Sequence, residues 1–204
     1  LVLATSETDK AELHLTFADS RVEEMTALAE RGRPEKVNIA VNGYDRAMAM
    51  AIKKTEEASG KGLSIADISE IVALATSRHL SVLDGVKDIV PEEAKQAIIQ
   101  AKETSSNGQK NALRALAREN PARAMEINLA AIEGRLNRAK EKAGEKEIEG
   151  VEDAIDDIGE LSKLGEEISE IAQGLGKDTT AVEDLVARAT RHHLDVLAIV
   201  YEKV

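Results

Sequence analysis

The sequence predicts an all-α protein: a tandem repeat of antiparallel three- or four-helix bundle units with a long connecting helix. The first observation is composition. Apolar residues form 43% of the 204 residues, yet the chain holds one Phe, two Tyr and no Trp. Ala, Leu, Ile, Val, Glu and Lys dominate, as they do in packed helices. The second observation is that no stretch alternates apolar and polar residues as a half-buried strand would.

The third observation is an internal repeat. A shift of 114 positions aligns residues 11–90 with 125–204 without a gap, and about 20 of the 80 pairs are identical. The densest block pairs Thr76, His79, Leu80, Val82, Leu83 and Val86 with Thr190, His193, Leu194, Val196, Leu197 and Val200. We therefore expect one three-helix unit over 1–90, a connecting fourth helix over 91–118 and a second three-helix unit over 119–204. The fourth helix of the second unit would lie beyond this chain.

The first two helices are delimited by cap and turn residues. Ser6, with Asp9 three residues later, is typical of a capping box at a helix start. Gly32 favours the end of that helix, and Pro34 favours the start of the next one. The "SGKG" segment at 59–62 predicts the end of the second helix.

The third helix is expected to start at Ser64, capped with Asp67, and it carries His79 on its apolar seam. The segment 91–117 contains "SSNG", which suggests a loop. Small and apolar residues keep a heptad spacing through it, however, so we expect one continuous helix that includes Gly108.

The second unit repeats this punctuation. Asn120-Pro121 predicts a helix start, and turns are expected at 142–147 and 174–180. Thr180 with Glu183 is expected to cap the last helix.

Charge and composition narrow the function classes. The formal net charge is −11, so we expect no nucleic-acid partner, because a phosphate backbone would be repelled and stacking aromatic residues are nearly absent. No apolar run reaches the ~18 residues that span a bilayer. The absence of cysteine excludes disulfides and thiol catalysis.

Motifs for catalysis, metals or cofactors do not emerge. The chain has no HExxH pair, no Glu-x-x-His pair, no G-x-S-x-G elbow and no phosphate-binding glycine loop. The acidic runs at 151–157 and 165–170 have helical spacing, and the chain has no D-x-[DN]-x-[DN]-G calcium loop. We therefore predict no catalytic residue, no metal site and no cofactor, and the chain is not expected to be an enzyme.

One group of polar residues is a candidate site. Helices joined by short turns are antiparallel, so residues equally distant from a turn lie at one height. This places Arg21, Tyr44, His79 and Glu103 in one layer, with His79 buried and bonded to Arg21 or Glu103. A buried polar layer could fix helix register, which we favour, or could bind a ligand.

The second unit offers only part of this layer. Arg135 and His193 match Arg21 and His79, whereas Ile158 replaces Tyr44. His193 is expected to be more exposed than His79, because no fourth helix follows it.

The sequence also resembles a known family. The resemblance rests on "HLSVLDGVKDIVPEEAKQAIIQAKETSSNGQKNAL", "ENPARAMEINLAAIEGRLNRAK" and "EEISEIAQGLGKDTTAVEDLVARATRHHLDVLAIVYEKV". These segments resemble a family of helical domains of unknown function found in exported archaeal and bacterial proteins. The resemblance implies an extracytoplasmic location and no particular activity. We expect a non-catalytic helical module that spaces, anchors or binds a protein partner or envelope component. The alternative is a ligand or metal-ion sensor built on the layer around His79.

Overall fold

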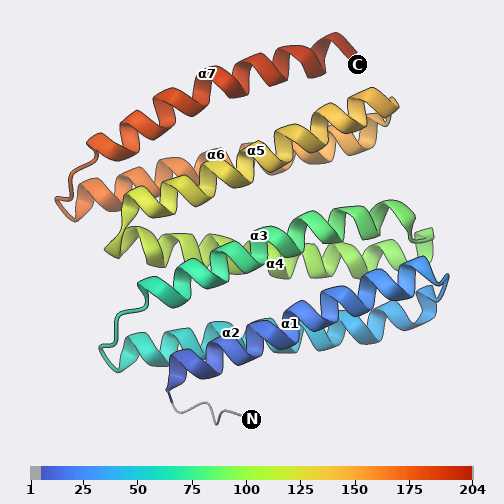
Figure 1. Ribbon diagram of the computed structural model, residues 1–204, viewed down its shortest axis with the longest axis horizontal. Coiled ribbons are helices and arrows are strands. Elements are labelled where there is room, and N and C mark those ends of the chain that lie inside the picture. Colours follow the sequence, from blue (N-terminus) through green and yellow to red (C-terminus); the bar gives the residue numbers. More distant parts are fainter. Residues whose placement is uncertain (1–5, 204) are drawn as a thin grey trace. The chain divides into compact units, whose positions relative to one another are not determined.

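The computed structural model describes residues 6–203, and within that range it consists of seven α-helices, one short 3-10 turn and no strand (Figure 1). This confirms the all-α prediction. The chain divides into two compact units, Leu1–Ala112 and Leu113–Val204. Leu1–Thr5 and Val204, the expected counterpart of Val90, lie outside the described residues.

The first unit contains α1 (Glu7–Glu30), α2 (Val37–Gly60), α3 (Ala66–Ile89) and the part of α4 (Glu92–Glu119) that precedes residue 113. Helix α1 packs along both α2 and α3. The core of the first unit is built from small and branched apolar side chains, because the sequence has few aromatic ones. The largest fully buried side chains of this unit are those of Tyr44, Met25, Met48, Leu83 and Ile98.

The ends of these helices follow local chemistry. Ser6 and Asp9 form the predicted capping box, and Gly32 takes a left-handed φ of 63° after α1. Pro34 begins a 3-10 turn, Pro34–Lys36, and α2 follows at Val37. Ile65, not the predicted Ser64, is the N-cap residue of α3; Ser64 Oγ accepts from the backbone N–H of Ala66 at 3.5 Å, outside a capping box.

Helix α4 is unbroken through Asn107-Gly108, which confirms the heptad-based prediction. Gly108 is buried because α4 approaches its neighbours closely there. A Cβ built on Gly108 would lie 3.1 Å from Met48 Cε and 3.3 Å from Thr76 Cγ2. A residue without a side chain therefore stays in the helix where a loop would otherwise be expected, despite its low helix propensity.

The second unit contains residues 113–119 of α4, then α5 (Pro121–Glu145), α6 (Ile148–Gly174) and α7 (Thr180–Lys203). Helix α5 packs against both α6 and α7. Helix α5 starts at Pro121 as predicted, and Asn120 caps it by accepting a hydrogen bond from the backbone N–H of Arg123. The cap of α7 lies one or two residues earlier than predicted: Asp178 accepts from the N–H of Thr180, and Thr179 donates to Glu183.

Helix bounds and turn geometry recur at the repeat spacing. Helices α3 and α7 begin and end at positions 114 apart, and so do the residues with positive φ. Gly62 and Gly176 have φ of 71° and 65°, and Gly32 and Lys146 have φ of 63° and 61°. Superposition of residues 11–90 on 125–204 stays a prediction.

Candidate functional site

A chain of polar side chains crosses the core of the first unit, with one member from each helix. His79 Nε2 lies 2.6 Å from Asp19 Oδ1, and His79 Nδ1 lies 3.1 Å from the Tyr44 hydroxyl. The Tyr44 hydroxyl also bonds to the Ser105 hydroxyl. We call Asp19, His79, Tyr44 and Ser105 the His79 chain. It connects α1, α3, α2 and α4 in that order.

The hydrogen bonds of the His79 chain have one consistent direction. A neutral His79 that carries its proton on Nε2 donates to the Asp19 carboxylate, which can only accept. Its Nδ1 then accepts from the Tyr44 hydroxyl, and that oxygen accepts from Ser105. Every polar atom in the interior of this chain therefore has a partner.

Burial sets the protonation of the chain. Tyr44, His79 and Ser105 are buried, whereas the Asp19 side chain is 42% exposed. Burial lowers the pKa of His79, and the hydrogen bond to Asp19 opposes this shift only in part. Burial also raises the pKa of the Tyr44 hydroxyl, which remains protonated. The three buried members of the His79 chain are thus neutral, and only its exposed end is a carboxylate.

Two residues predicted for this layer lie elsewhere. Arg21 is exposed, pairs with Glu24 and lies across Gly43, whose added Cβ would be 2.9 Å from Arg21 Cδ. Glu103 is exposed, and Ser105 reaches Tyr44 instead. Counting residues from a turn gives the height of a side chain but not its direction. Two residues along a helix turn the side chain by about 200°.

The second unit holds a looser version of this arrangement. His193 Nε2 lies 3.8 Å from Glu133 Oε2, and His192 Nε2 lies 3.1 Å from Glu133 Oε1. The His193 side chain is 16% exposed against 3% for His79, and burial lowers its pKa. Arg135 is buried, with Nε 3.2 Å from Asp157 Oδ2.

Sequence reasoning missed two members of the His79 chain, Ser105 and Asp19. Under the repeat shift Asp19 pairs with Glu133, so a carboxylate stands near the matched histidine in both units. Counting identical pairs hides this signal because Asp and Glu differ. Charge similarity at matched positions would have identified the acidic partner.

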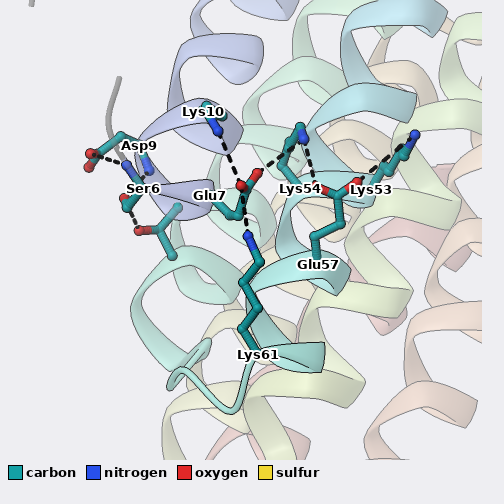
Figure 2. Close-up of polar contacts among 9 residues, drawn as sticks. Ser6, Glu7, Asp9, Lys10, Lys53, Lys54, Glu57 and Lys61 are labelled. Atoms are coloured by element: carbon teal, nitrogen blue, oxygen red, sulfur yellow. Dashed lines mark hydrogen bonds and ion pairs between the residues drawn. The ribbon is translucent and has the colours of Figure 1, made fainter. Parts of the chain in front are cut away.

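A second polar cluster joins the start of α1 to the end of α2 (Figure 2). The Glu7 carboxylate lies 3.1 Å from Lys10, 3.0 Å from Lys54 and 2.9 Å from Lys61. Hydrogen bonds from Lys61, Lys54 and Lys10 hold the pKa of Glu7 well below its usual range. Lys54 also bonds to Glu57 at 2.6 Å. Mutual ion pairing of this kind ties two helix ends together.

Among residues 6–203, no three His, Asp or Glu side chains gather closely enough to hold a metal ion. The Tyr44 and Ser105 hydroxyls are buried among helices, away from any substrate in solvent. None of the described helices is both long enough and apolar enough to cross a bilayer.

A protein-family model matches part of the chain. The model of a domain of unknown function, DUF5667, matches residues 1–93, which is the first three helices with the start of α4. The chain is similar to that domain over somewhat less than half of its length. No curated protein matches the sequence.

Proposed function

We propose that this chain is a non-catalytic helical module that acts outside the cytoplasm and binds another protein. One observation carries the proposal: α7 exposes a row of mostly uncharged residues at positions where α3 buries its own. The extracytoplasmic location is supported by the resemblance to helical domains of exported proteins.

The exposed row runs along a single face of α7. It recurs at helical spacing of three and four residues, and all its members are exposed. We call it the α7 stripe; it consists of Glu183, Ala187, Thr190, Leu194, Ala198 and Tyr201. The matching residues of α3 are Ser69, Ala73, Thr76, Leu80, Asp84 and Lys87, of which all but Lys87 are buried.

Leucine gives the clearest comparison. Leu80 is 6% exposed and its counterpart Leu194 is 61% exposed, although the sequence around the two is the most similar in the repeat. Val186 and Ile199, beside the stripe, are each 38% exposed. Apolar residues gathered on one exposed face are typical of interaction surfaces, whereas single exposed ones are ordinary.

The His79 chain supports a structural role for the core, not a ligand site. Its interior atoms bond to one another, so a ligand would have to replace existing hydrogen bonds. A fully paired polar chain rigidifies a bundle and fixes its register. This favours a stable scaffold that presents a surface.

Affinity capture with matched variants tests the proposal. The wild-type chain, Leu194→Glu and Leu175→Glu serve as baits for envelope extracts; Leu175 is 55% exposed and lies at the end of α6, off the stripe. A partner protein retained by the wild type and Leu175→Glu but lost with Leu194→Glu supports the proposal. If Leu194→Glu retains the same proteins as the wild type, the α7 stripe is not the interaction surface.

A further inference from the structure

We infer that the partner presents an amphipathic helix with a contact face of small residues and a carboxylate placed to meet Arg191. This inference rests on the proposed function and names the class of partner. It is drawn from what covers the equivalent face of the first unit and from the charges that differ between the two faces.

In the first unit, a helix of this kind covers the α3 face. Helix α4 places Gly108 against Thr76, and Gln109 donates to the Ser77 hydroxyl. Further along, Lys102 pairs with Asp84 at 2.7 Å. The side of α4 that is buried in this unit consists largely of Ala94, Ala97, Ile98, Ala101, Ser105 and Gly108. Small side chains let two helix backbones approach closely, so most of this contact is shape complementarity.

The α7 face of the second unit keeps several side chains of the α3 face that α4 covers. Thr190, Leu194 and Ala187 repeat the identities of the buried α3 residues at the same positions. On α6, Gly159 corresponds to Asp45, which accepts from Thr104 of α4 at 2.7 Å. A Cβ on Gly159 would meet nothing within 4 Å, so that surface of α6 is also open.

Two substitutions between the units set the charge that the partner must carry. Arg191 occupies the position of Ser77, the residue that meets Gln109 of α4. An exposed guanidinium there is best matched by a carboxylate at the place of Gln109. Ala198 occupies the position of Asp84, so a partner lysine placed as Lys102 is in α4 would face Ala198 in place of a carboxylate. The expected helix therefore resembles α4 with Gln109→Glu and Lys102→Ala.

A synthetic peptide makes this a direct experiment. The probe is residues 91–112 with Gln109→Glu, Lys102→Ala and Asn107→Lys. A lactam between positions 103 and 107, both exposed in α4, holds the helix. Binding to the intact 204-residue chain is measured by calorimetry and by NMR shifts in α7.

The expected result is one peptide per chain, with NMR shifts concentrated at the α7 stripe. Leu194→Glu should weaken binding at least about tenfold, and Leu175→Glu should leave it unchanged. Arg191→Glu should reverse the peptide preference, so that a Gln109→Lys peptide binds better than the Gln109→Glu peptide. Equal binding to the wild type and Leu194→Glu, or no binding at all, would overturn the inference.

The outcome for the proposed function is separate. If Leu194→Glu still abolishes capture of a partner protein while the peptide does not bind, the partner is of another kind and only the inference is lost. Sedimentation of the chain alone covers a second copy: self-association abolished by Leu194→Glu would identify the occupant as another molecule of this chain and would overturn the inference.

Discussion

Tyr44→Phe isolates the contribution of the His79 chain to stability. The substitution keeps the buried ring and removes one oxygen, so the packing against His79, with ring centroids 5.4 Å apart, is retained. It leaves His79 Nδ1 and the Ser105 hydroxyl without their partner in a buried site. Each stranded polar group costs about 1–3 kcal/mol.

The magnitude is reduced by one local alternative. The Ser105 hydroxyl can turn to the carbonyl one helical turn earlier, as serines in helices do. His79 Nδ1 has no such alternative on its own helix, because an imidazole nitrogen without a proton can only accept. We expect a loss of about 2–4 kcal/mol in the free energy of unfolding of the first unit.

Urea unfolding followed by far-UV circular dichroism measures this loss. The two compact units can unfold in separate steps, so each transition is assigned to the unit in which substitutions shift its midpoint. Tyr201→Phe is the matched control, since Tyr201 is the other tyrosine of the chain and is 86% exposed. Adding Ser105→Ala to Tyr44→Phe should recover part of the loss, because no hydroxyl is then stranded. A Tyr44→Phe effect within about 0.5 kcal/mol of the Tyr201→Phe effect would refute the reasoning.

Three further predictions concern particular positions. Gly108→Ala should destabilise the first unit by up to about 2 kcal/mol in urea unfolding. The added methyl group would meet Met48 and Thr76, and Thr76 is held by hydrogen bonds to the carbonyls of Val72 and Ala73. The control Gly85→Ala, with open space around it, should be neutral or stabilising. Lys146→Gly should stabilise the second unit by about 1 kcal/mol, because φ is 61° there, whereas Lys146→Ala should give no such gain. His79 has a lowered pKa in the folded chain, so the unfolded chain takes up the proton first, and stability should fall as the pH drops below about 6.5. The His79→Gln variant should show a shallower slope of the free energy of unfolding against pH. Equal slopes for this variant and the wild type would contradict the prediction.

The sequence was sufficient for the helices and for one pair of the polar layer. Cap and turn residues located α1, and heptad spacing predicted that α4 continues through Gly108, because both signals are local in the sequence. Level counting placed Tyr44 beside His79, since antiparallel helices of known ends have defined heights.

The remaining partners depended on direction around the helix axis. Arg21 and Glu103 are at suitable heights but face away from His79, whereas Asp19 and Ser105 face it. That direction is fixed only when four helices pack together, and small residues such as the half-buried Gly43 and the buried Gly108 set how closely they do so. The greater exposure of His193 was predicted, whereas that of Leu194 was not, since Leu80 and Leu194 stand in nearly the same string of residues.

The central claim is that matched faces are covered in the first unit and open in the second, and thiol labelling tests it most directly. The chain contains no cysteine, so Leu80→Cys and Leu194→Cys each introduce a single reporter at matched positions. Maleimide labelling of each native variant is compared with its rate in urea. At position 194 the native rate should approach the unfolded rate, and at position 80 it should be at least about a hundredfold slower, because that site reacts only when the unit opens. Equal protection of the two positions would contradict the claim.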